Sequence, residues 1–183
     1  GKLNSVGPAE LKFSSDEMMT MIALSGLSEK SKPIFEILES TRGWPAAVQL
    51  IIRGAAKGVG FKVTAKQISS SVDPLRLVAA EFVRTLPPED KANLLPLSIT
   101  DEFTPELAQA ILGKGFSQSA LDTFTSEGTV LSKSNDAIPV YRIHSLIREF
   151  LYQELSSDES TCTECHRLAS LYFENELDAT KAL

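Results

Sequence analysis

The sequence predicts a mainly α-helical protein in which a helical domain is followed by a winged helix. Apolar residues recur at helical spacing between capping and terminating signals along most of the 183 residues. Only two short segments have β character, "TVLS" at 129–132 and "PVYRI" at 139–143, and the turn-rich "KSNDA" joins them. The three predicted helices directly before this hairpin and the one directly after it form, with the hairpin, the outline of a winged helix.

The helical domain is expected over residues 11–86 and contains four predicted helices. Ser14 and Glu17 form a capping box for the first helix, and Asp73 followed by Pro74 is an N-cap with a first-turn proline for the fourth. "FKVTAKQISSS" is expected to be a polar connection. The predicted starts and stops are Ser14 and Gly26, Ser31 and Gly43, Pro45 and Gly58 or Gly60, and Asp73 and Leu86.

The winged helix is expected over residues 87–156. Its first three helices should begin near Pro88, at Thr104-Pro105 and at Ser117, with Gly113 and Gly128 closing the second and third. The closing helix should begin near Ser145. After the polar "SSDES", Thr161 and Glu164 are expected to form a capping box for a last helix.

Composition excludes several classes of protein. A formal net charge of −6 argues against a surface dominated by nucleic-acid binding. No apolar run approaches the roughly 20 residues that a membrane span needs, and the first residues lack a signal-peptide core, so we expect a cytoplasmic protein. The sequence contains no GxxxxGK[ST] phosphate loop, GxGxxG, GxSxG or HExxH motif, and we therefore expect no enzyme.

The segment "CTECH" at 162–166 matches the CxxCH pattern of haem attachment, and Cys162, Cys165 and His166 could also be metal ligands. Haem attachment requires export, and zinc usually requires a fourth ligand from a second pair. We therefore expect no metal and no haem, and two small reduced cysteines on the first turn of a helix.

A winged helix also allows direct DNA binding. The third predicted helix, however, lies in a stretch without Lys or Arg between Lys114 and Lys133, and this stretch contains Asp122 and Glu127. Because phosphate contacts supply most non-specific affinity, this segment is expected to be a poor DNA reader.

Two further features have a structural and a functional interpretation. Gly43-Trp44-Pro45 is explained by a helix-terminating glycine and a first-turn proline, or by an indole and a proline ring that face a planar ligand. His144, where a strand leads into a helix, could bond a neighbouring backbone group or donate to a phosphate. The residues alone leave both alternatives open.

Five ordered segments resemble one family. These are "LKFSSDEMMTMIALSGL", "STRGWPAAVQLIIRGA", "AAEFVRTLPPEDKANLLPLSIT", "YRIHSLIREFLYQEL" and "HRLASLYFENEL". From about Glu10 to the C-terminus the chain resembles the middle of a MalT-like, LuxR-type ATP-dependent transcriptional regulator of the STAND class. Such proteins consist of a P-loop domain, a helical domain, a winged helix, a helical sensor superhelix and a C-terminal DNA-binding helix-turn-helix.

The resemblance implies that this chain is the helical and winged-helix part of a nucleotide-dependent switch, with residues 160–183 as the start of a TPR-like sensor domain. ADP or ATP would be bound mainly by a P-loop domain outside this sequence. "IHSLIRE" is similar to the Met-His-Asp motif, with Ile143 and Ser145 in place of Met and Asp, so His144 would contact the β-phosphate of ADP. Gly43-Trp44-Pro45 is similar to the Gly-x-Pro motif, which places Pro45, and with it Trp44, on the adenine side.

The expected partners are therefore the P-loop and sensor domains of the same protein. DNA would be contacted only through the helix-turn-helix, no membrane is involved, and self-association could accompany activation. The alternatives are a plain winged-helix DNA-binding factor, which needs a basic face, and a helical interaction scaffold without a ligand.

Overall fold

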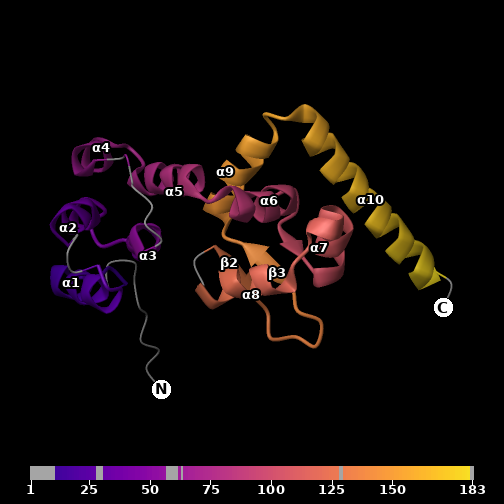
Figure 1. Ribbon diagram of the computed structural model, residues 1–183, viewed down its shortest axis with the longest axis horizontal. Helices are drawn as coiled ribbons and strands as arrows, with labels where there is room; N and C mark the ends of the chain where they lie inside the picture. The colour runs from indigo at the N-terminus through magenta and orange to yellow at the C-terminus, as the bar shows by residue number, and fades with distance from the viewer. Residues whose placement is uncertain (1–10, 28–30, 57–61, 63, 128–129, 182–183) are drawn as a thin grey trace, which may run out of the picture. The chain divides into compact units, whose positions relative to one another are not determined.

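The computed structural model describes residues 11–27, 31–56, 62, 64–127 and 130–181, and Figure 1 shows its elements along the chain. The chain divides between Leu86 and Pro87 into two compact units. Helices and one small three-stranded sheet account for the regular structure, which confirms the predicted mainly α fold class.

The first unit is a helical bundle. Helix α3 packs mainly on α5, and α2 contacts α1, α3 and α4. The bundle core consists of apolar side chains that are almost fully buried, among them Ile22, Leu38, Val48, Ile51, Ile68 and Val78. Its described helices are α1 (Ser15–Leu24), α2 (Ser31–Ser40), α3 (Pro45–Ala56), α4 (Ala65–Ser70) and α5 (Pro74–Thr85).

Helix α4 corrects the prediction of four helices, because it lies in the segment expected to be a polar connection. Thr64 and Gln67 form a capping box, in which the Thr64 hydroxyl accepts from the Gln67 backbone N–H and Gln67 accepts from the Thr64 N–H. Ile68 is 1% exposed and anchors the short helix to the bundle. One buried apolar side chain among polar neighbours gave no periodic pattern. The capping box of Ser14 and Glu17 and the N-cap at Asp73 are confirmed.

The second unit is a winged helix followed by a long helix, as Figure 1 shows. Strand order in its sheet is β1-β3-β2, with both pairs antiparallel. Phe103 lies opposite Tyr141, and Leu131 lies opposite Ile143, so that four buried side chains cover one face of the sheet. Its elements are α6 (Pro88–Leu97), β1 (Glu102–Phe103), α7 (Pro105–Leu112), the 3-10 turn η2 (Gly113–Gly115), α8 (Gln118–Glu127), β2 (Leu131–Lys133), β3 (Tyr141–Ile143), α9 (Ser145–Leu155) and α10 (Glu159–Lys181).

Strand β1 was not predicted, because two residues are too few to show an alternating pattern. The start of the last helix was also predicted wrongly. Helix α10 begins at Glu159, and Asp158 accepts from both the backbone N–H and the hydroxyl of Thr161, at 3.2 and 2.5 Å. Thr161 is thus inside the helix, and Glu164 pairs with Arg167 at 2.6 Å instead of capping. The predicted stops at Gly58, Gly60 and Gly128 lie outside the described residues.

Gly43 occupies a tightly packed backbone position in the first unit. Its φ is +72°, and a Cβ added there would lie 2.1 Å from the carbonyl oxygen of Phe13. The Gly43 carbonyl also accepts from the Phe13 N–H at 2.9 Å, which ties the segment before α1 to the α2–α3 connection. Gly26 has a similar φ of +70°, but its missing Cβ would meet nothing within 4 Å.

These two glycines form a matched test. Gly43→Ala should lower the free energy of unfolding of the first unit by roughly 2–4 kcal/mol, because the left-handed backbone costs about 1–2 kcal/mol and the contact with Phe13 adds to it. Gly26→Ala should cost only the backbone part. Urea unfolding followed by the fluorescence of Trp44, the one tryptophan of the chain, measures both. Equal losses for the two variants would contradict the role of the Phe13 contact.

Candidate functional site

The connection between α2 and α3 has an unusual backbone. Arg42 and Gly43 both have positive φ, +56° and +72°. Among the described residues, Arg42 is the one non-glycine residue with a positive φ. Left-handed residues other than glycine are uncommon and are a reason to examine a site for function. Arg42 and Gly43 form the turn that leads from α2 to Trp44. Trp44 directly precedes α3, and its carbonyl accepts from the Val48 N–H at 2.9 Å, which begins the first turn of the helix.

A cavity of about 320 Å³ opens beside this connection. Trp44 lines it and is 47% exposed, whereas Pro45 is half-buried and does not line it. The remaining lining comes from Thr41, Arg42, Ala47 and the segment 71–75 before and at the start of α5. The cavity is at the lower end of the range of small-molecule sites, about 300–1,000 Å³.

The polar side chains that line this cavity differ in whether they already have a hydrogen-bond partner. The Asp73 carboxylate accepts from the Arg76 N–H at 3.1 Å and caps α5, and the Thr41 hydroxyl donates to the Leu38 carbonyl at 2.6 Å. The Arg42 guanidinium is exposed, and within the described part of the chain it has no ion-pair or hydrogen-bond partner. The cavity therefore offers a flat indole and an unpaired guanidinium, a combination suited to a planar ligand with negative charge or acceptor atoms.

His144 lies in the second unit as the N-cap of α9. Its imidazole is exposed and makes no capping hydrogen bond, while its backbone N–H donates to the Val130 carbonyl at 2.9 Å. The backbone N–H groups of the first turn of α9 give this end of the helix a partial positive charge. The side chain is thus available to an anion at this helix start.

Of the predicted site residues in the first unit, Trp44 lines the cavity, whereas Gly43 and Pro45 are its neighbours in sequence and do not line it. His144 belongs to the other unit, and a site shared by the two units stays a prediction. Arg42 and the segment 71–75 were missed by the sequence analysis. Neither has a local signal, because positive φ at arginine follows from tertiary packing and not from residue type.

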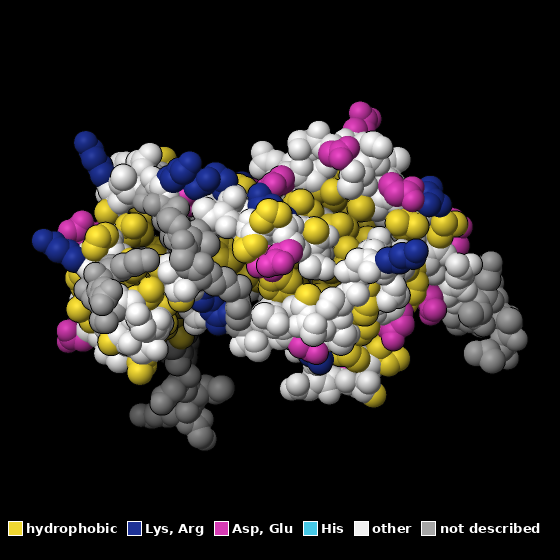
Figure 2. All heavy atoms as spheres, viewed as in Figure 1, with side chains coloured by type: hydrophobic (Ala, Val, Ile, Leu, Met, Phe, Trp, Pro, Cys, Tyr) yellow, Lys and Arg dark blue, Asp and Glu magenta, His cyan; other side chains and the backbone are white. Residues whose placement is uncertain are grey.

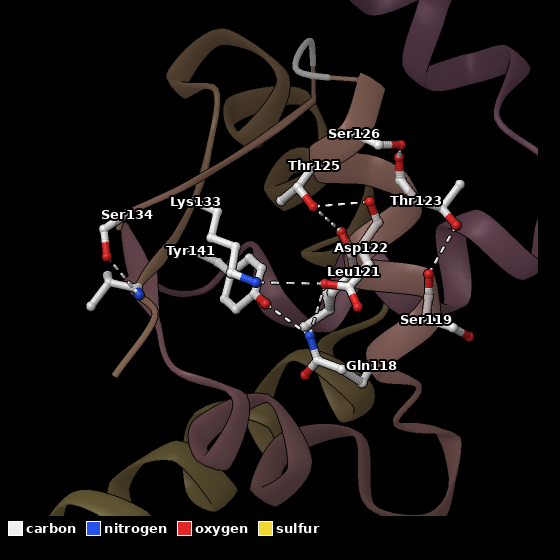
Figure 3. A network of polar contacts seen from close by, with 11 residues as sticks. Gln118, Ser119, Leu121, Asp122, Thr123, Thr125, Ser126, Lys133, Ser134 and Tyr141 are labelled. Carbon is white, nitrogen blue, oxygen red and sulfur yellow. Dashed lines mark hydrogen bonds and ion pairs between the residues drawn. The ribbon is translucent and has the colours of Figure 1, made fainter. Parts of the chain in front are cut away.

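Figure 3 shows how α8, the helix that would enter a DNA groove in a winged helix, is joined to the wing. Gln118 donates to the Tyr141 hydroxyl at 2.8 Å and to Asp122 at 3.2 Å. Asp122 lies 3.8 Å from the Lys133 ammonium, which is 5.5 Å from the centre of the Tyr141 ring. Lys133 of the wing is therefore held by an acidic side chain of this helix.

Three other basic side chains of the second unit are also close to carboxylates. Arg148 lies 2.6 Å from Asp101, and Lys91 lies 2.6 Å from Glu154. Arg142 contacts Glu102 across the sheet. Such exposed pairs add little stability, but a phosphate would have to compete with each carboxylate.

The two units differ in charge. The first contains 11 Lys and Arg and 8 Asp and Glu, and the second contains 7 and 16, so their formal charges are +3 and −9. In the view of Figure 2, acidic side chains are scattered over the second unit among patches of hydrophobic atoms. An anionic ligand is favoured on the first unit and disfavoured on the second, except at local donors such as the start of α9.

Cys162, Cys165 and His166 are not arranged as ligands. In the described residues no group of three or more His, Cys, Asp or Glu side chains could hold a metal ion. Cys165 is buried in the second turn of α10, not in the first as expected, and burial raises the pKa of its thiol. The His166 ring lies 3.4 Å from the Tyr152 hydroxyl. Among the described residues, the helices also lack the combination of length and apolar character needed to cross a membrane.

Comparison with known proteins identifies a matching family model and several related kinases. Residues 79–163 match the family model of the MalT winged helix domain. Over 175 residues the chain is 27% identical to the serine/threonine-protein kinase PknK of Mycobacterium tuberculosis, and equally to PknK of Mycobacterium bovis. These alignments cover 94% of this chain but 16% of each kinase, so the chain spans about a sixth of the length of the curated relatives it matches.

The winged-helix fold is confirmed, and residues 79–163 form a MalT-like winged-helix region. Its helices and strands follow one another in the predicted order, with β1 added. The match indicates a regulatory, transcription-factor-like protein.

We predict no measurable binding of duplex DNA at physiological salt, because α8 carries no Lys or Arg and Lys133 is paired with Asp122. A fluorescence anisotropy titration with labelled duplex measures this. Submicromolar binding that weakens with salt would favour a plain winged-helix DNA-binding factor.

The purified chain should contain neither zinc nor haem, because its Cys and His side chains are not grouped for ligation in the described residues. Elemental analysis and the visible absorption spectrum test this directly. Stoichiometric zinc, or a Soret band, would show the prediction wrong.

The two thiols should react at different rates. Alkylation by iodoacetamide should be faster at Cys162, because Cys165 is 5% exposed and burial raises its pKa. A raised pKa means that the Cys165 thiolate forms only at higher pH, so its rate should rise later in a pH series. Mass spectrometry of Cys162→Ser and Cys165→Ser separates the two profiles, and coincident profiles would contradict the assignment.

Proposed function

We propose that this chain is the regulatory part of a signal-transducing transcriptional regulator of the MalT-like, LuxR-type STAND class. It would close over an adenine nucleotide that a separate P-loop domain holds, and pass the state of that nucleotide to a sensor and output region. By itself the chain would be no enzyme and at best a weak nucleotide binder, since the phosphate cradle would lie elsewhere.

The observation that carries the proposal is a winged helix whose groove-facing helix has no basic residue and is joined to the wing through Asp122 and Lys133. This arrangement leaves the MalT-like winged-helix region poorly suited to DNA. A regulatory use of the domain is consistent with both features. The chain is similar to part of a protein named a kinase, and residues 79–163 also match a domain named for MalT. Both similarities are consistent with a regulatory module that is joined to different output domains in different proteins.

The nucleotide part of the proposal is supported by chemistry on each unit. The first unit is basic and presents Trp44 and Arg42 at one cavity. An indole can stack on a base, and a guanidinium can pair with a phosphate or with acceptor atoms of the ring. On the second unit, His144 and the first turn of α9 would donate to the β-phosphate.

In such a switch, ADP would favour the closed and inactive arrangement only by the contacts that it makes better there. His144 is suited to this role because its imidazole is exposed and takes no part in capping α9. Loss of its contact would weaken ADP binding and the closed state together.

The experiment uses a protein that joins this chain to the P-loop domain that the proposal requires. His144→Ala should weaken ADP binding about ten- to hundredfold, because a charge-assisted hydrogen bond is worth roughly 1.5–3 kcal/mol. It should also raise basal transcription. Isothermal titration calorimetry and a reporter assay measure the two effects.

His166→Ala is the matched control, since His166 is the other histidine of the chain and is also exposed. It should leave both ADP affinity and basal transcription at wild-type values. Wild-type values for His144→Ala in both assays would show that His144 is a structural junction residue.

A further inference from the structure

Arg148 joins the start of α9 to the end of α6. These two helices of the second unit pack on each other (Figure 1). Arg148 is the fourth residue of α9, and its guanidinium contacts two residues at and after the end of α6. Nη1 donates to the Ser98 carbonyl at 3.0 Å, and Nη2 lies 2.6 Å from Oδ1 of Asp101. The planar fork of a guanidinium can hold two partners in this way at the same time.

The Ser98 carbonyl is the partner that most needs this donor. Ser98 is the C-cap of α6 and is fully buried, and the last carbonyls of a helix have no partner within the helix. A buried carbonyl without a donor is costly, and a cation is favoured at this negative end of the helix dipole. The Asp101 side chain is 82% exposed, so water screens its ion pair with Arg148. The contact with Ser98 is therefore the stronger anchor of the two.

Arg148 also holds the backbone of His144. The Arg148 N–H donates to the His144 carbonyl at 2.9 Å, which is the first hydrogen bond of α9. On the other side, the His144 N–H donates to the Val130 carbonyl at 2.9 Å. The His144 backbone is thus fixed from both sides, while its imidazole is exposed and makes no capping hydrogen bond. The position of the imidazole depends on where α9 begins, and Arg148 ties that beginning to α6.

We infer that Arg148 is a positioning residue for the phosphate contact of His144. The inference rests on the proposed function, in which His144 donates to the β-phosphate of ADP. Arg148 stays on Ser98 and Asp101 and does not touch the nucleotide. It holds the first turn of α9, and a hydrogen bond weakens steeply when its donor is displaced or misaligned. Loss of the anchor is therefore felt at the phosphate through His144.

The test is a double-mutant cycle for ADP affinity, in the protein that joins this chain to a P-loop domain. Arg148→Ala should weaken ADP binding about three- to tenfold when His144 is present, because groups in one hydrogen-bond network are coupled. In the His144→Ala background the same substitution should change ADP affinity less than about twofold, since no imidazole is left to position. Isothermal titration calorimetry measures the wild type, both single variants and the double variant.

Lys91→Ala is the matched control. It removes the same charge and breaks another ion pair between α6 and α9, in which Lys91 lies 2.6 Å from Glu154 in the last turn of α9. It should leave ADP affinity within about twofold of the wild-type value, because it lies away from the start of α9.

Arg148→Lys separates position from charge. Its ammonium keeps the charge but cannot hold Ser98 and Asp101 together, so ADP binding should weaken at least about twofold. Circular dichroism confirms that each variant is folded, and Arg148→Lys carries the cycle if Arg148→Ala does not fold.

Failure of this inference differs from failure of the proposed function. Unchanged ADP affinity in His144→Ala would overturn both. A loss in His144→Ala, together with no effect of Arg148→Ala or the same effect in both backgrounds, would overturn the inference alone. Wild-type affinity in Arg148→Lys would mean that the charge is sufficient, and equal losses in Lys91→Ala and Arg148→Ala would mean a general loosening of α6 and α9. Either result also contradicts a positioning role.

Discussion

The packing around Tyr141 is the constraint on which the winged helix depends. This residue sits in the central strand β3, is fully buried, and stacks on Phe103 of β1 with 5.7 Å between ring centres. Its hydroxyl accepts from Gln118 of α8, and its ring faces the Lys133 ammonium of β2. One side chain thus joins three strands and a helix, and its buried polar atom is satisfied, as a buried hydroxyl requires. A change at Tyr141 would loosen the sheet and α8 together.

The contacts around Tyr141 also explain how this protein combines a winged-helix fold with a surface that is poorly suited to DNA. The helix α8 and the wing have the geometry that many proteins use to contact DNA. The Gln118 and Asp122 side chains of α8, however, contact Tyr141 and Lys133 of the wing. The basic first unit and the acidic second unit then favour different ligands. Under the proposed function, the winged helix would be part of a regulatory assembly and would contact the nucleotide at the start of α9.

The sequence was sufficient for elements with a start signal, a periodic apolar face and a stop signal. Helix α5, with Asp73, Pro74 and buried Val78 and Phe82, has all three, and it was predicted correctly. Elements that depend on distant contacts were missed. Strand β1 exists because Phe103 pairs with Tyr141 nearly forty positions later, and α4 exists because Ile68 fills a space in the bundle. In the candidate site, Trp44 and His144 were named from their residue type and motif. The cavity that adds Arg42 and residues 71–75 depends on a left-handed connection and on the packing of α3 against α5, neither of which is encoded locally.

The proposed function requires that a bound nucleotide be contacted both at the start of α3 and at the start of α9. Hydrogen–deuterium exchange with and without ADP tests this most directly, in a protein that joins the chain to a P-loop domain. The account predicts that ADP slows exchange both at the first-turn amides of α3, Ala46 to Val48, and at those of α9, Ser145 to Arg148. Unchanged exchange at either helix start, under conditions where ADP is bound, would contradict it.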